Sequence, residues 1–206
     1  KVVHFITRLI LGGAQENTLL TVEDQHHLHG DQVTLITGPG LGPEGSLIER
    51  ALTQGLDVRI IENLRREIHL ARDWSSFRQL RSLLKSIRPD IVHTHSTKAG
   101  IMGRAAAWQL GIPAVHTIHG PAFYDQQSRP VYEFYRLLEK WAARRSDKLI
   151  SVCDAMSSQY IRAGVAPPEK FVTVYSGMEV EQFLNPPHSR EEVRNRFGFT
   201  DRKSVV

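Results

Sequence analysis

The sequence predicts a parallel α/β domain, in which a Rossmann-like sheet of about seven strands carries helices on both faces. Two observations support this expectation. Short runs rich in Val and Ile recur along the chain, and amphipathic helical patterns lie between them. Strands and helices that alternate this regularly are typical of a parallel sheet covered on both sides. With 206 residues, 41% of them hydrophobic, the chain is long enough to bury one full core.

The expected strands are short apolar runs that read as buried. In chain order they cover residues 2–6, 32–37, 57–61, 90–94, 114–118, 148–152 and 171–175. Ligands of open α/β sheets bind outside the carboxyl ends of the strands, so chemistry is expected at that edge.

Two helices are clear between these strands. Residues 73–88 form an amphipathic helix, with Asp73 as the expected N-cap and Pro89 as the stop. Its apolar stripe is Trp74, Phe77, Leu80, Leu84 and Ile87, opposite the arginines. The second helix, residues 131–145, carries Val131, Phe134, Leu138 and Trp141 on one face.

The C-terminal segment predicts a domain boundary. Asn185-Pro186-Pro187 is linker-like, residues 189–197 form a short charged helix, and residues 204–206 look like the start of a strand. We therefore expect one domain over residues 1–184. Residues 185–206 would then hold the linker, the short helix and the first strand of a second, truncated domain.

Charge and cysteine content narrow the class of protein. The net charge of +4 favours anionic partners, either phosphate-bearing substrates or an anionic membrane surface. Nucleic acid is not expected as a partner, because neither aromatic interleaving nor a recognition motif accompanies the basic residues. The single cysteine, Cys153, cannot form an internal disulfide, and no apolar run approaches the roughly 20 residues that span a bilayer. We therefore expect a cytoplasmic protein.

Gly12 and Gly13 follow the first expected strand and precede a helix that starts at about Ala14. Glycines at a helix N-terminus suit a phosphate group, because backbone amides can approach it and the helix dipole adds positive charge. The alternative is a tight turn that needs a positive φ. The run from Gly40 to Gly45 matches a dinucleotide fingerprint, but it follows the second strand and contains Pro43, so we reject a nicotinamide-dependent function.

Histidines cluster at the ends of the fourth and fifth strands. His93 and His95 end one strand, and His116 and His119 end the other. We expect His93 and His116 to pack in the core and His119 to face the cleft, because Gly120 and Pro121 end the strand just after it. A metal site would need further ligands, for which Asp125 is the one obvious candidate, and no metal is expected. Ser96 and Lys98 open the next helix and are candidates for holding a substrate anion, although an exposed lysine at a helix start is ordinary.

Five segments together are similar to a known family. They are Gly12-Gly13-Ala14-Gln15, DIVHTHSTKAGIMGRAAA from Asp90, HTIHG from His116, ISVCDAMSSQYI from Ile150 and VYSGMEVEQF from Val174. In this order they resemble the N-terminal half of the retaining glycosyltransferases of family four, which have two Rossmann-like domains. Ser176-Gly177-Met178-Glu179 departs from the more usual Asn-Gly-Val-Asp.

The resemblance implies partners and residue roles. A nucleotide-sugar donor would transfer its sugar, with retention of configuration and without a cofactor, to a glycan or lipid-linked acceptor. His119 would be the catalytic residue facing the transferred sugar, and Gly12 and Gly13 would approach the donor diphosphate. The expected acceptor or substrate-binding residues are Gln15, His95, Ser96, Lys98 and Gly120.

The second domain of the family holds most donor contacts, so we expect these 206 residues alone to be inactive and to self-associate through the face that this domain would cover. Peripheral contact with the inner face of the membrane, through the basic helix of residues 73–88, is a further expectation. The alternatives are a nucleotide-sugar epimerase-like protein and a non-catalytic nucleotide-binding α/β domain, because fold alone does not choose among them.

Overall fold

A computed structural model describes residues 1–199, apart from the side chain of Gln182. The chain divides into two compact units, Lys1–Ser176 and Gly177–Val206. The first unit holds a seven-stranded parallel sheet in the order β3-β2-β1-β4-β5-β6-β7, which confirms the expected fold class. The strands are β1 (Val2–Arg8), β2 (Val33–Gly38), β3 (Asp57–Ile60), β4 (Ile91–His95), β5 (Ala114–Ile118), β6 (Lys148–Ser151) and β7 (Phe171–Thr173).

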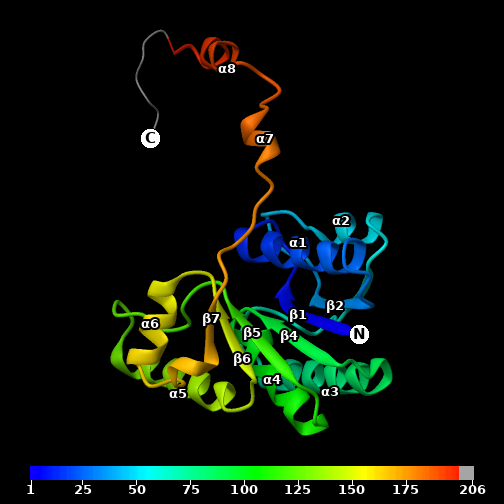
Figure 1. Cartoon of the computed structure of the whole chain (residues 1–206), viewed down its shortest axis with the longest axis vertical. Coiled ribbons are helices and arrows are strands. Elements are labelled where there is room, and N and C mark those ends of the chain that lie inside the picture. Colours follow the sequence, from blue (N-terminus) through cyan, green and yellow to red (C-terminus); the bar gives the residue numbers. More distant parts are fainter. Residues whose placement is uncertain (200–206) are drawn as a thin grey trace. The chain divides into compact units, whose positions relative to one another are not determined.

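Helices cover both faces of the sheet. In the first unit they are α1 (Gly13–His27), α2 (Ile48–Thr53), α3 (Leu70–Ile87), α4 (Thr97–Leu110), α5 (Arg129–Ala143), α6 (Asp154–Arg162) and the 3₁₀ helix η1 (Pro168–Lys170). Figure 1 shows α1 and α2 on one face, and α3, α4 and α5 on the other. No helix among the described residues is long and apolar enough to cross a membrane.

Each face of the sheet has its own apolar core. Ile6 and Leu35 pack with Leu19 of α1 on one side, whereas Phe5 packs with Leu80 of α3 on the other. Neighbours along β1 therefore point to opposite sides, as the pleat of a strand requires. Helix α4 lies close to the sheet because Gly100 leaves room for His116: a Cβ built on Gly100 would lie 2.5 Å from Cε1 of His116.

The order of the strands reverses beside β1. The chain runs from β1 through β2 to β3 in one direction, and then places β4 on the other side of β1. Such a reversal is the point at which open α/β sheets form their ligand crevice, at the carboxyl ends of the strands. In this chain the crevice is flanked by the turns that follow β1 and β4.

The helix of residues 73–88 begins earlier than the sequence predicts. Helix α3 starts at Leu70, and its N-cap is His69, whose ring accepts from the backbone N–H of Arg72 at 3.4 Å. The prediction of Asp73 as N-cap was wrong, because the Asp73 carboxylate lies inside the first turn and accepts from the backbone N–H of His69 at 3.0 Å. Leu80 and Leu84 are buried as expected, whereas Trp74 is 62% exposed.

In the second unit, the helix expected over residues 189–197 is confirmed as α8 (Arg190–Arg196). Ser189 caps it in a capping box with Glu192. The structure adds a short helix, α7 (Glu181–Leu184), that the sequence did not suggest. The expected strand at 204–206 lies outside the described residues, and the domain boundary after residue 184 stays a prediction.

Candidate substrate site at the carboxyl edge of the sheet

The turn between β1 and α1 presents the start of a helix to the crevice. Gly12 is the N-cap of α1, with φ 164° and ψ 151°, and its backbone carbonyl accepts from the N–H groups of Gln15 and Glu16. Neither Gly12 nor Gly13 has a left-handed φ, so the alternative of a turn that needs positive φ was wrong. A Cβ on Gly12 would lie 2.9 Å from Oε1 of Gln15, whereas one on Gly13 would meet nothing within 4 Å.

The turn between β4 and α4 is strained. Ser96, the N-cap of α4, has φ 59° and ψ 156°, a combination that costs roughly 1–3 kcal/mol outside glycine. Its Oγ lies 2.7 Å from Oγ1 of Thr7, and Thr7 Oγ1 also accepts from the backbone N–H of Ala99 at 3.1 Å. These hydrogen bonds connect the start of α4 with the end of β1, and the two segments flank the crevice.

The clustered histidines divide between the two faces of the sheet. His116 lies on the α4 side, where its Nδ1 is 3.1 Å from the backbone oxygen of Thr94. His93 and His95 lie together on the other side, with ring centroids 4.2 Å apart. His4 of β1 joins them, since it is opposite His93 in the register. The sequence expectation of core packing holds for His116, which is 3% exposed.

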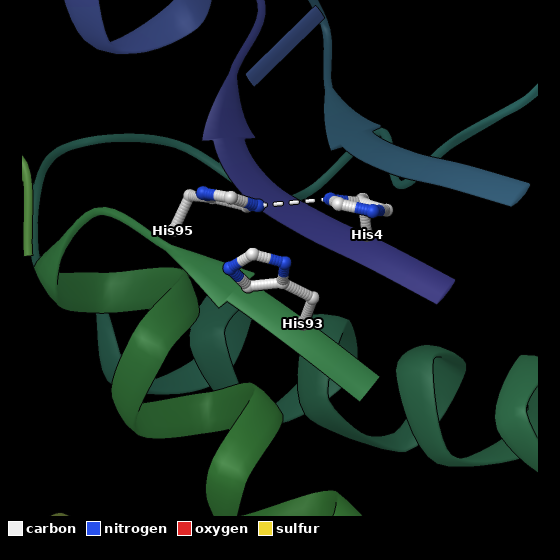
Figure 2. A group of neighbouring side chains, drawn as sticks. All are labelled: His4, His93 and His95. Carbon is white, nitrogen blue, oxygen red and sulfur yellow. Dashed lines mark hydrogen bonds between the residues drawn. The ribbon is translucent and has the colours of Figure 1, made fainter. Parts of the chain in front are cut away.

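A row of hydrogen-bonded side chains runs through this cluster to the pocket. Oε1 of Gln25 lies 2.8 Å from Nε2 of His4, and Nδ1 of His4 lies 3.0 Å from Nε2 of His95. Nδ1 of His95 then lies 3.1 Å from Nε2 of His119. Figure 2 shows the bond between His4 and His95, with the ring of His93 beside it. We call Gln25, His4, His95 and His119 the histidine relay.

The donor and acceptor nitrogens of the histidine relay can be assigned by starting from Gln25. A neutral imidazole donates from one nitrogen and accepts at the other. Because Oε1 of Gln25 can only accept, His4 carries its proton on Nε2 and accepts at Nδ1. His95 therefore donates from Nε2, and His119 donates from Nε2 to Nδ1 of His95. This assignment leaves Nδ1 of His119 as an acceptor.

Burial keeps these rings neutral near pH 7. It lowers the pKa of His4 from 6.5 to about 4, against a smaller opposing effect of the hydrogen bond that His4 donates to Gln25. Burial also lowers the pKa of His119 to about 4, and it lowers the pKa of His93 and His95 well below 6.5, with further lowering by neighbouring histidines. His119 is therefore a hydrogen-bonding group at neutral pH, not a cation.

His4, His93 and His95 are near enough to one another to be considered as metal ligands, because one nitrogen from each lies within 4.8 Å of the others. The group does not suit a divalent ion. The nitrogens of His4 and His95 that face each other already share a hydrogen bond, and the group contains no carboxylate to neutralise a buried dication. The bond between His4 and His95 and a bond between Nε2 of His93 and Oγ1 of Thr117, at 2.7 Å, together account for the three rings.

The pocket at this edge has a volume of about 290 Å³. It brings together His119 and Gly120 after β5, Ser96 before α4, and Ala14 in the first turn of α1. Five of the expected site residues are not among its lining residues, so their roles stay predictions: Gly12, Gly13, Gln15, His95 and Lys98. The full lining is Ala14, Ser96, Thr97, His116, Thr117, Ile118, His119, Gly120, Glu139 and Tyr160.

Lys98 has partners of its own. Its Nζ lies 2.7 Å from Oδ1 of Asp73 and donates to the backbone oxygen of Glu67. Only 14% of the Lys98 side chain is exposed. These contacts neutralise the charge with which Lys98 would hold a substrate anion, and that role stays a prediction.

The sequence reasoning missed the far wall of the pocket and the buried part of the relay. Glu139 of α5 lines the pocket and forms an ion pair with Arg104 of α4 at 2.9 Å, with both side chains nearly inaccessible to solvent. His4 carried a weak signal, because it is the one ionisable residue between Val2 and Ile6, in a run that is otherwise apolar.

A parallel sheet with a pocket at the carboxyl ends of its strands, beside the point where the strand order reverses, is the architecture of doubly wound α/β proteins that bind ligands there. A family described as "Glycosyl transferase 4-like domain" matches residues 12–177. The chain therefore belongs to this family, and the expected resemblance to the N-terminal half of a two-domain glycosyltransferase is confirmed.

Two curated relatives carry transferase names. A UDP-Gal:alpha-D-GlcNAc-diphosphoundecaprenol alpha-1,3-galactosyltransferase of Escherichia coli is 36% identical over 161 residues, which are 72% of this chain and 42% of that protein. A D-inositol 3-phosphate glycosyltransferase of Thermobifida fusca is 31% identical over 117 residues, which are 54% of this chain and 26% of that protein. The chain thus spans less than half of the length of either relative.

Solved structures agree on the fold. Anabaena HepE, in complex with UDP and glucose, superposes with a TM-score of 0.68 at 16% identity, over 95% of this chain and 50% of that one. A UDP-GlcNAc 2-epimerase of Neisseria meningitidis superposes with a TM-score of 0.66 at 14% identity, over 97% of this chain and 53% of that one. At these identities the superpositions show the fold alone, so the epimerase likeness does not indicate an epimerase activity.

Proposed function

We propose that this chain is the acceptor-side half of a retaining glycosyltransferase that moves a hexose from a nucleotide-sugar donor to a diphosphate-linked lipid acceptor. Membership of the family supports the transfer reaction. The 36% identity to a galactosyltransferase, whose name specifies a UDP-Gal donor and a diphosphoundecaprenol acceptor, supports the donor and acceptor classes. We place the protein in the cytoplasm, peripherally on the inner face of the membrane, where such an acceptor would present its sugar.

The observation that carries the proposal is the position of His119. Its neutral ring lines the pocket that also contains Ala14 from the first turn of α1. A helix N-terminus stabilises a diphosphate through its free amides, and a neutral imidazole can hydrogen-bond a sugar hydroxyl as charge develops at the anomeric carbon. Both kinds of group are therefore present where a nucleotide sugar would lie in this half of the enzyme.

Each group of this chain has one role in the proposed mechanism. The amides at the start of α1 hold the leaving diphosphate, and His119 orients the sugar ring. The histidine relay fixes which nitrogen of His119 carries the proton. The remaining charge of the diphosphate would be neutralised by basic side chains of the second domain. We therefore expect residues 1–206 alone to transfer no sugar.

A transfer assay on an enzyme that contains both domains tests the proposal. UDP-galactose, UDP-glucose and UDP-N-acetylglucosamine would be offered with a GlcNAc-diphosphate-lipid acceptor, and NMR would give the anomeric configuration of the product. We expect transfer with retention. An inverted product would refute the retaining mechanism. Epimerisation of a UDP-sugar without an acceptor, or UDP binding with no turnover, would instead support one of the two alternatives.

A further inference from the structure

Helix α5 turns its large apolar side chains outward. The sequence predicts an apolar face on this helix, yet the residues that α5 buries are Glu139, Ala142 and Ala143. Val131, Phe134, Leu137 and Trp141 are 42%, 54%, 54% and 40% exposed. At 100° per residue these four positions fall within an arc of about 120°, so they form one continuous stripe.

A tryptophan of the neighbouring helix extends the stripe. Trp108 of α4 is 58% exposed, and the guanidinium of Arg145 lies over both Trp108 and Trp141, at 4.6 Å and 3.9 Å from the two ring centroids. We call this surface the α5 face and define it as Trp108, Val131, Phe134, Leu137, Trp141 and Arg145. Exposed apolar surface of this kind, rimmed by charge, marks an interaction site.

The charge around the α5 face is positive. The segment from Arg129 to Arg145 contains five cations and two carboxylates. Both carboxylates are paired, Glu133 with Arg136 at 2.7 Å and Glu139 with the buried Arg104 at 2.9 Å. The helix therefore offers cations beside its apolar stripe with no free carboxylate of its own.

A pocket of about 390 Å³ borders the C-terminal half of α5. Lys140, Arg144 and Lys170 contribute to its lining, together with apolar residues that include Val165 and Pro167. Cations grouped in a shallow, partly apolar pocket suit the phosphate of a lipid headgroup.

We propose that the α5 face docks this protein on an anionic lipid surface. Tryptophan rings stacked with arginine are suited to the boundary between headgroups and acyl chains, and the cations next to them attract anionic lipids. A second copy of the chain fits less well, because a two-fold contact would bring the same cations together on both sides. The inference depends on the proposed function only for the identity of the lipid-linked acceptor.

The place of α5 in the fold relates this surface to the substrate site. The segment after β5 contains His119 and leads directly into α5, so the helix begins at the edge of the sheet where the pocket lies. Its first exposed apolar residue, Val131, is two residues beyond the helix start. A protein docked along α5 would hold its pocket near the membrane surface, within reach of an acceptor anchored in the bilayer.

Vesicle co-sedimentation of the 206-residue chain tests the proposal without donor or acceptor, so an inactive transferase would leave it standing. Vesicles of phosphatidylcholine with phosphatidylglycerol would be compared with phosphatidylcholine alone. We expect binding to the anionic vesicles, weakened by salt, and at least about tenfold weaker partition for Phe134→Glu/Leu137→Glu. Lys140→Gln/Arg144→Gln should weaken binding to the anionic vesicles alone.

The matched control is Leu28→Glu. Leu28 is 75% exposed and follows α1 on the opposite face of the sheet, and its replacement should leave partition unchanged. Unchanged circular dichroism would show that each variant folds. The proposal is overturned if the Phe134→Glu/Leu137→Glu variant binds vesicles like the wild type. It is also overturned if the wild type binds no vesicle but forms a dimer by light scattering, and Phe134→Glu/Leu137→Glu abolishes that dimer. The α5 face would then contact a second copy of the chain.

Discussion

Nδ1 of His95 lies 3.1 Å from Nε2 of His119, and this hydrogen bond joins a half-buried ring at the pocket to a chain of buried rings that ends at Gln25. The proton on a histidine that faces substrate is set by the partner of its other nitrogen. For His119 that partner is a neutral, almost inaccessible imidazole whose own state depends on His4. A side chain on α1, remote from the pocket lining, thereby sets which nitrogen of His119 carries the proton.

Replacing Gln25 should change the tautomer of His119. In wild type and in Gln25→Glu, an oxygen accepts from His4, so His119 should carry its proton on Nε2. Gln25→Leu removes that acceptor and should give a mixture of tautomers. Nitrogen-15 chemical shifts of the histidine rings at pH 7 report both states. A His119 signal that is the same in all three proteins, or that differs between wild type and Gln25→Glu, would contradict the relay.

The stability of the domain should fall as the pH is lowered from 6.5 toward 4. Burial lowers the pKa of His4 from 6.5 to about 4, so in this window the unfolded chain takes up a proton that the folded chain does not. A shift of this size corresponds to at most about 3 kcal/mol in the free energy of unfolding. Urea titrations at several pH values would measure the slope. His4→Gln should reduce the slope but not remove it, because His93, His95 and His119 also have lowered pKa values. The exposed His29→Gln should leave it unchanged, and equal slopes in all three proteins would argue against the assignment.

Breaking the ion pair between Arg104 and Glu139 should destabilise the fold strongly. Their side chains are 0% and 3% exposed, so Arg104→Met leaves a buried, unpaired carboxylate at a cost of roughly 3–5 kcal/mol. The double variant Arg104→Met/Glu139→Gln removes both charges and should recover part of that loss. Urea denaturation gives the three free energies. A double variant less stable than Arg104→Met would show that the pair is not the source of the effect.

The backbone of this site was predictable from local patterns, but its side-chain contacts were not. Buried parallel strands read as short runs rich in Val and Ile, so the positions of His95 and His119 at two carboxyl ends followed from the sequence. The contact of His4 with His95 depends on the placement of β4 beside β1, across 91 residues, which no local pattern encodes. The outward stripe of α5 was likewise hidden, because periodicity locates an apolar face without saying whether the sheet or the solvent meets it.

Residues 1–206 alone should bind UDP weakly. Among the described residues, the start of α1 and the pocket around His119 lie where we expect UDP, whereas the resemblance implies that most donor contacts lie in the second domain. We expect a dissociation constant no better than millimolar, or about 4 kcal/mol of binding free energy. Isothermal titration calorimetry of this chain with UDP measures it. Micromolar affinity would mean that a complete donor site lies in this domain.

His119→Ala should lower kcat of the two-domain enzyme by roughly 100-fold, about 3 kcal/mol, with little change in donor binding. The ring lines the pocket and is neutral near pH 7, so its hydrogen bond can strengthen as positive charge develops on the transferred sugar. His119→Gln keeps a hydrogen-bonding group and should recover part of the rate. The matched control is His29→Gln, on an exposed residue. If His119→Ala lost thermal stability and activity together, the role of His119 would be only to shape the loop before Pro121. If the variant kept its melting temperature and a kcat within about threefold of wild type, His119 would have no part in the mechanism.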